Sequence, residues 1–174
     1  MCVRVLRLPL LAALAMVAAC TGTDPYNPGT PIGSFHVVST LTASTCGNAP
    51  NPWEFDVKLS SDHNTLFWKQ GDAPVAGTMD PTSHVSMSAT TAATVIPPNP
   101  RTNPTGCTIG RTDSLAISLT GAPISAFAGT LSYTFEAANN TDCSAAIGAE
   151  GYAALPCTVS YTIAATKTDT PTTK

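Results

Sequence analysis

Apolar and polar residues alternate with a period of two along most of the chain after residue 34. The clearest example is residues 53–60, WEFDVKLS, in which every odd-numbered position is apolar. Such alternation is typical of a β-strand with one buried face and one solvated face. Comparable patterns predict seven further strands, at about 35–44, 65–69, 75–79, 85–95, 108–120, 127–135 and 159–163. No segment after residue 20 has a helical period, so the sequence predicts an all-β fold of eight strands.

The links between these strands differ in length in an ordered way. Residues 61–64, 80–84 and 121–126 are short, turn-like links after the second, fourth and sixth strands. The links after the first, fifth and seventh strands are long and span 45–52, 96–106 and 137–156. The link after the third strand, near residues 71–73, is short. In an antiparallel up-and-down meander, alternate links lie at opposite ends. We therefore expect one end closed by hairpins and one end that carries most of the loops.

Eight strands in this order can close into a barrel, and closure removes the exposed edges of the sheet. A two-sheet sandwich of immunoglobulin type is the alternative. We favour the barrel.

The first twenty residues have a different pattern. Two arginines precede an apolar run at 8–19, which is shorter than the roughly 20 residues of a transmembrane helix. The run ends in VAAC at 17–20. It is typical of a secretory signal, and its end resembles the lipobox of bacterial lipoproteins. The resemblance implies that residues 1–19 are removed and that Cys20 carries a lipid that anchors the protein to a membrane. An ordinary signal that leaves Cys20 as a free thiol is the alternative.

Residues 21–33 contain three prolines and three glycines and have few groups to bury. We expect a spacer here, which in an extended form would reach roughly 40 Å. In the lipoprotein family, an Asp directly after the lipidated cysteine favours retention in the inner membrane. This chain has Thr21 at that position. The resemblance therefore implies an exported protein in the outer membrane. The predicted parts are a signal at 1–19, the lipidated cysteine and spacer at 20–33, a β-domain at 34–167 and a flexible tail at 168–174.

Composition excludes some partners. Without Arg4 and Arg7, the 155 residues after the signal contain six Lys and Arg against 11 Asp and Glu, a net charge of −5. They contain no basic stripe of the kind that neutralises phosphate groups, so we expect no nucleic-acid partner.

Four cysteines remain for the folded domain once Cys2 leaves with the signal and Cys20 takes a lipid. An even number in an exported chain predicts two disulfides. A zinc site is the alternative, but such sites usually contain Cys-x-x-Cys pairs, which are missing here. All four cysteines lie in the links of the loop-rich end, so they should meet there. Three pairings are open, and we favour Cys143–Cys157 with Cys46–Cys107. The four residues are Cys46, Cys107, Cys143 and Cys157.

Signatures of catalysis and of metal binding are missing from the sequence, including nucleophile elbows, zinc-protease motifs, phosphate-binding loops and calcium loops. We expect His36, His63 and His84 to be separate surface residues at or near the hairpin end. Glu54 and Asp56 have the spacing of an acid–base pair, but they alternate with large apolar residues and should point to water. The sequence therefore predicts no enzyme, no cofactor and no metal.

Eight meandering strands with one loop-rich end resemble the calycin architecture of lipocalins and avidins, and Gly33-x-Phe35 resembles the lipocalin Gly-x-Trp. An eight-stranded barrel is just wide enough to be filled by side chains or to hold one small ligand, and both alternatives stay open here. The aromatic candidates to line the interior are Trp53, Phe55, Phe127, Tyr133 and Phe135.

The first strand begins at the hairpin end, so that end should face the membrane and the disulfide-braced loops should face away from it. We expect a tethered, non-enzymatic domain that presents these loops to a small apolar molecule, a glycan or an envelope protein. A structural envelope lipoprotein with a filled core and no soluble ligand is the alternative.

Mass spectrometry of the mature N-terminus tests the lipid anchor. We expect the mature chain to begin at Cys20 with a mass increase that corresponds to acyl groups. An unmodified Cys20, or a cleavage site elsewhere, would contradict this prediction.

Overall fold

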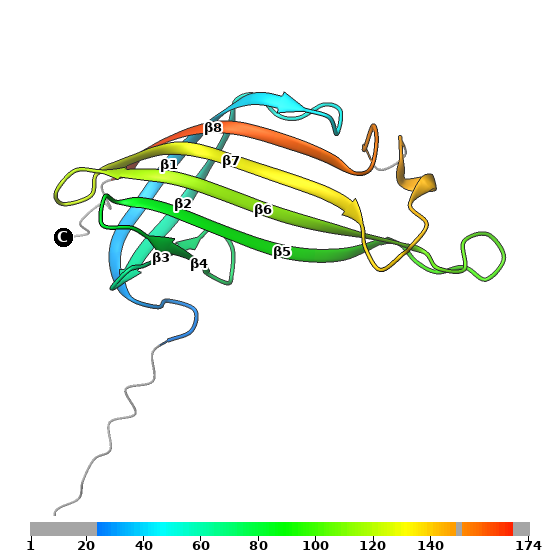
Figure 1. Ribbon diagram of the computed structural model, residues 1–174, viewed down its shortest axis with the longest axis horizontal. Coiled ribbons are helices and arrows are strands. Elements are labelled where there is room, and N and C mark those ends of the chain that lie inside the picture. Colours follow the sequence, from blue (N-terminus) through cyan, green and yellow to red (C-terminus); the bar gives the residue numbers. More distant parts are fainter. Residues whose placement is uncertain (1–23, 149–150, 169–174) are drawn as a thin grey trace, which may run out of the picture.

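The computed structural model describes residues 24–148 and 151–168. Its strands form one closed antiparallel barrel, in which each strand pairs with the next and the last pairs with the first (Figure 1). The predicted all-β meander is confirmed, and the barrel is confirmed over the sandwich. None of the described residues forms a helix long and apolar enough to cross a membrane. The elements are β1 (Thr30–Ser44), β2 (Trp53–Asp62), β3 (Thr65–Lys69), β4 (Val75–Met79), β5 (His84–Ile96), β6 (Cys107–Thr120), β7 (Ala126–Ala137), a short 3-10 helix η1 (Ser144–Ala146) and β8 (Cys157–Thr168).

The bounds of β3 and β4 agree with the sequence pattern, whereas β1 begins five residues before the predicted strand. Residues 30–33 were expected in the spacer, but Thr30 and Pro31 pair with Ser61 and Ser60 of β2. A register shift between Pro31 and Gly33 accommodates the proline, which cannot donate a backbone hydrogen bond to a sheet. Cys20 and the lipobox lie outside the described residues.

The half of the barrel nearest the hairpins is filled by side chains. Phe35 of β1 and Phe127 of β7 are almost fully buried, with ring centroids 5.4 Å apart. Trp68 of β3 packs against Phe127 at 5.6 Å, and it lies at the boundary of this filled region. Aliphatic residues from β1, β2, β3, β6 and β8 complete it: Val37, Val57, Leu59, Leu66, Ile117 and Ile163.

The two ends of the barrel differ as predicted. The hairpins after β2, β4 and β6 close one end, and the chain enters β1 beside the β2–β3 hairpin at that end. The long links after β1, β5 and β7 lie at the other end (Figure 1). All four cysteines lie at this loop end, because they follow β1 or β7 or begin β6 or β8.

The favoured disulfide pairing is wrong. The bridges are Cys46–Cys157 and Cys107–Cys143, with Cα atoms 4.9 Å and 4.7 Å apart. Barrel closure explains the first bridge, because pairing of β1 with β8 brings the end of one strand to the start of the other.

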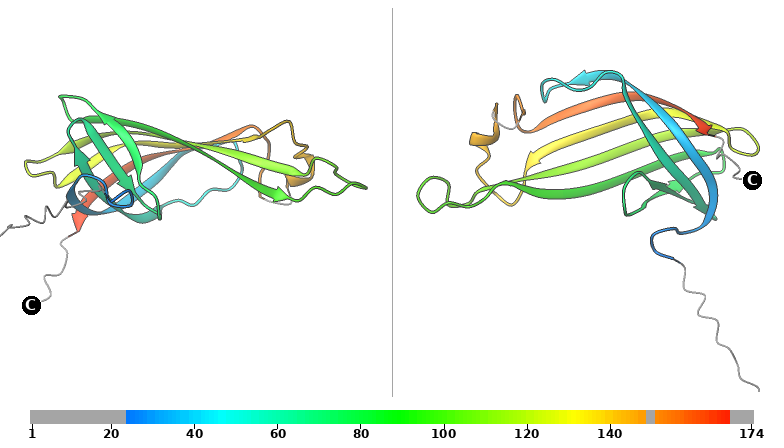
Figure 2. Two further views of the ribbon diagram at one scale, coloured as in Figure 1. Left: turned by 90° about the horizontal axis from the view of Figure 1, so that it is seen from below. Right: turned by 180° about the vertical axis from the view of Figure 1, so that it is seen from behind.

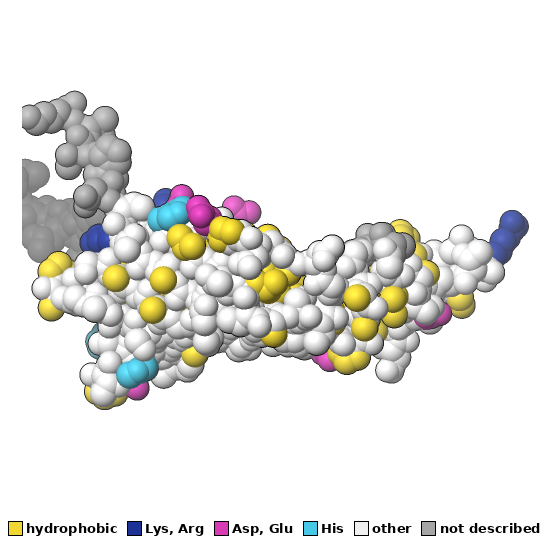
Figure 3. All heavy atoms as spheres, turned by 90° about the horizontal axis from the view of Figure 1, so that it is seen from above, with side chains coloured by type: hydrophobic (Ala, Val, Ile, Leu, Met, Phe, Trp, Pro, Cys, Tyr) yellow, Lys and Arg dark blue, Asp and Glu magenta, His cyan; other side chains and the backbone are white. Residues whose placement is uncertain are grey.

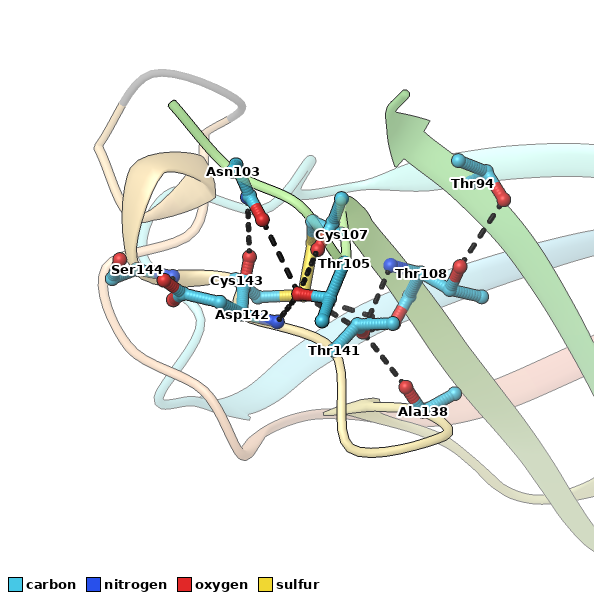
Figure 4. The surroundings of a disulfide bond; sticks show 11 residues. Thr94, Asn103, Thr105, Cys107, Thr108, Ala138, Thr141, Asp142, Cys143 and Ser144 are labelled. Carbon is cyan, nitrogen blue, oxygen red and sulfur yellow. Dashed lines mark hydrogen bonds between the residues drawn. A yellow bond between two sulfur atoms is a disulfide. The ribbon is translucent and has the colours of Figure 1, made fainter. Parts of the chain in front are cut away.

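The second bridge depends on how the β7–β8 link folds back on β6 (Figure 4). The backbone N–H of Thr108 donates to Thr141 Oγ1 at 3.0 Å, and Ala138 N–H donates to Thr108 O at 2.8 Å. These contacts hold Cys143 beside Cys107 and away from Cys157, its neighbour in the sequence.

The wall of the barrel is low on one side because β3 and β4 are only five residues long, whereas β5 and β6 have 13 and 14. β4 pairs with β5 only near Val85 and Ser86, and β3 pairs with β2 only over 58–62. Beyond these points β5 to β8 continue with β1 and the start of β2 as a curved sheet toward the loop end (Figure 2).

The two bridges should contribute unequally to stability. Cys46–Cys157 closes a loop of 111 residues and Cys107–Cys143 one of 36. The chain-entropy relation gives the longer loop about 1 kcal/mol more stabilisation. We expect a double Cys46→Ser, Cys157→Ser variant to lose more free energy of unfolding in urea than a double Cys107→Ser, Cys143→Ser variant. Equal losses, or the reverse order, would contradict this account.

Candidate functional site

A cavity of about 770 Å³ occupies the loop end of the barrel, above the filled half. Trp68, Leu115 and Leu131 lie at its deep side, where the walls are buried. Its rim is formed by three of the links at the loop end, at 48–50, at 70–73 and at 151–152. The rim is lowest at the β3–β4 link because these strands end early. The cavity therefore opens at the end opposite the chain's entry into β1.

Aromatic rings form much of the cavity wall. The Trp53 ring lies 5.8 Å from the ring of Tyr133 and 5.6 Å from that of Tyr161, between centroids. Near the rim, Phe135 and Tyr152 are 5.5 Å apart. Rings at these separations and tilts attract one another beyond the area they bury. The rings of the wall therefore support one another.

All five residues expected to line the interior belong to the core or pack against it, and three of them also line the cavity. Trp53, Tyr133 and Phe135 line the cavity. Phe55 packs instead beside Trp53 in the core, with centroids 4.6 Å apart, and Phe127 lies in the filled half. Alternation assigns a residue to the interior face but does not show where along the barrel the filled region ends.

Three lining aromatics were not among the candidates. Trp68 and Tyr161 occupy inward positions of strands that the sequence pattern predicts, so the signal was present. Tyr152 lies in the β7–β8 link, where no periodicity gives its direction.

One ion pair is part of the cavity wall. Arg111 Nε and Nη2 donate to the two carboxylate oxygens of Asp113, each at 2.7 Å. The guanidinium carbon also lies 5.2 Å from the centre of the Tyr133 ring, in range for a cation–π contact. Sequence reasoning missed both residues, although they share the odd-numbered positions of the strand with the apolar Leu115.

Two tyrosine hydroxyls in the wall are held in the protonated form. Burial raises the pKa of Tyr133, and the nearby Asp113 carboxylate raises it further. Burial also raises the pKa of Tyr161. Both phenols are hydrogen-bond donors over the whole physiological range of pH.

The three histidines are separate surface residues near the hairpin end, as expected. His63 and His84 lie at the turns after β2 and β4, and His36 lies on the outer face of β1. In residues 24–148 and 151–168 no three His, Cys, Asp or Glu side chains form a group that could hold a metal ion. Few charged groups appear on the face shown in Figure 3.

The strand carboxylates point to water, as predicted, and both contact the same histidine. His36 Nδ1 lies 3.0 Å from Asp56 Oδ1, and His36 Nε2 lies 3.4 Å from Glu54 Oε2. The hydrogen bond to Asp56 is the main cause that raises the pKa of His36 above 6.5, and both acidic charges add to it.

An Asp56→Asn variant should therefore lower the pKa of His36 toward its ordinary value, as followed by NMR titration. A raised pKa in the folded state means that the contact stabilises the fold at low pH. This contribution is lost as pH rises through the raised pKa. Asp80→Asn, near His84, is the control and should leave the His36 titration in place. An unaltered His36 midpoint in the Asp56→Asn variant would show that the contact does not form in solution.

The described residues form a cavity that is open at the loop end, with aromatic rings in its wall and an ion pair on one side. Such a space can bind a small molecule that has flat apolar surfaces and a polar group. No protein-family model, curated protein or solved structure matches this chain. We therefore infer function from the chemistry of the cavity.

Proposed function

We propose that this protein is an exported, lipid-anchored binding protein that holds one small, flat and largely apolar molecule in the cavity at the loop end of its barrel. The cavity is the observation that carries the proposal. Its volume of about 770 Å³ lies within the range of about 300–1,000 Å³ that is typical of small-molecule sites.

The shape of the wall supports a flat ligand. Trp53, Tyr133 and Tyr161 present rings that pack on one another and are therefore fixed in position. Fixed rings lose little conformational freedom when a ligand binds between them, which favours affinity. The filled half beneath them, around Phe35 and Phe127, gives the cavity a rigid base.

The position of the cavity supports a tethered carrier. The chain enters β1 at the hairpin end, opposite the rim of the cavity. A lipid on Cys20 would place the hairpin end toward the membrane and the rim away from it. The two disulfides brace the loop end and are consistent with an exported protein. The outer membrane is the location that the lipoprotein resemblance favours.

A protein partner receives less support from the outer surface. The exposed large apolar residues of the described chain are Tyr26, Val38 and Ile147. They lie before β1, on β1 and in the β7–β8 link, and so form no continuous patch. Stable protein interfaces usually have a contiguous apolar centre, and the small-molecule proposal is therefore preferred.

Binding of the fluorescent probe phenylnaphthylamine (NPN) tests this function. The only two tryptophans of the chain, Trp53 and Trp68, both line the cavity. Energy transfer from them to NPN therefore reports probe in the cavity rather than probe dissolved in lipid or detergent. We expect saturable binding of one NPN molecule per chain.

A matched pair of variants locates the site. Ala89 lines the cavity, whereas Thr90 beside it is exposed on the other face of β5. Ala89→Phe should weaken NPN binding about tenfold or more, or about 1.4 kcal/mol, because the added ring occupies the cavity. Thr90→Phe should bind NPN as the natural protein does. No saturable energy transfer in the natural protein, or equal binding by both variants, would refute the proposed function.

A further inference from the structure

The ion pair in the cavity wall interrupts an apolar face. Arg111 and Asp113 occupy the same alternating positions of β6 as Ile109 and Leu115, which are 4% and 6% exposed. The pair is thus flanked on both sides, along one strand face, by buried apolar residues. Charged side chains are rare at inward positions of small barrels because they lose hydration there. A barrel that needed only a filled or apolar interior would carry apolar residues at both positions.

The guanidinium group is held in a fixed orientation with donors to spare. Its edge is bound by the two oxygens of Asp113, and its face lies over the Tyr133 ring. An arginine has five N–H donors, and these two bonds use one on Nε and one on Nη2. Within the described part of the chain Arg111 makes no further hydrogen bond. Three N–H groups remain for a molecule in the cavity.

Both residues of the pair line the cavity, and Arg111 is the more exposed of the two. The Arg111 side chain is 46% exposed and that of Asp113 is 28% exposed. Both carboxylate oxygens already accept a bond from the arginine.

The rest of the wall also offers donors. Tyr133 and Tyr161 keep their hydroxyl protons, and the indole N–H groups of Trp53 and Trp68 can only donate. These aromatic donors favour a molecule that supplies acceptors.

We propose that Arg111 binds an anionic group, a carboxylate or a sulfonate, on an otherwise flat and apolar ligand. This inference rests on the proposed function and names the class of its ligand. The aromatic rings hold the body of the molecule, and the three free N–H groups of Arg111 bind its acid group. Asp113 pairs with Arg111 in the absence of a ligand, and its negative charge opposes that of the bound acid group.

Two probes with the same ring system separate this inference from the proposed function. Anilinonaphthalene sulfonate (ANS) differs from NPN by one sulfonate group, so the ratio of their affinities reports recognition of the anion. We measure both by energy transfer from Trp53 and Trp68 in the full-length protein. In a double Arg111→Gln, Asp113→Asn variant, which removes both charges and keeps polar side chains at both positions, the affinity for ANS relative to NPN should fall about tenfold or more.

A second variant should move the ratio in the opposite direction. Asp113→Asn alone removes the negative charge that repels the sulfonate, so ANS should bind more tightly relative to NPN. Arg101→Gln is the control, because Arg101 is a cation of the β5–β6 link that does not line the cavity. It should leave both affinities in place. Opposite shifts in two variants of one ion pair cannot arise from a general loss of folding.

The outcomes distinguish the two proposals. Failure of the natural protein to bind NPN would refute the proposed function itself. If NPN binds but ANS does not, or if the double variant leaves the ratio unaltered, then Arg111 does not recognise an anion and only this inference falls.

Discussion

Pairing of β1 with β8 is the constraint on which the rest of the molecule depends. It joins the two ends of the described sheet and leaves a closed barrel, so that the interior can be filled from every strand. The same pairing brings Cys46 beside Cys157, where the disulfide fixes the seam at the loop end. Near this bridge Thr45 N–H donates to Thr158 O at 2.8 Å, and Thr158 N–H donates to Thr45 Oγ1 at 2.9 Å. The first and last strands are thus held together by three kinds of contact.

Unequal strand lengths leave a cavity at one end of this closed barrel. The hairpin of β3 and β4 reaches only partway along its neighbours, and the longer strands continue past it. Large side chains such as Phe35 and Phe127 fill the part that all eight strands enclose. Beyond it the space between the longer strands is open at the loop end and is not filled, and tilted aromatic rings form its wall. The short β3–β4 hairpin therefore accounts for the cavity within an ordinary eight-stranded barrel.

The two proposals depend on different parts of this wall. Binding of a flat molecule depends on the rings around Trp53, which are held by packing. Selection of an acid depends on Arg111, which is held by Asp113 and by the Tyr133 ring. The Arg111 side chain is 46% exposed, and its two hydrogen bonds to Asp113 fix its geometry.

The sequence by itself determined the number and order of the strands, the loop-rich end and the four cysteines that bond there. These are local properties, since alternation with a period of two and the length of each link can be read along the chain. Only the tertiary structure decided which cysteines pair, because Cys46 and Cys157 meet through the closing seam. It also decided that Phe127 lies in the filled half and Tyr133 in the cavity, although both belong to the same strand. The boundary between the filled core and the cavity depends on the length of the β3–β4 hairpin. The pattern within β7 contains no information about the length of that hairpin.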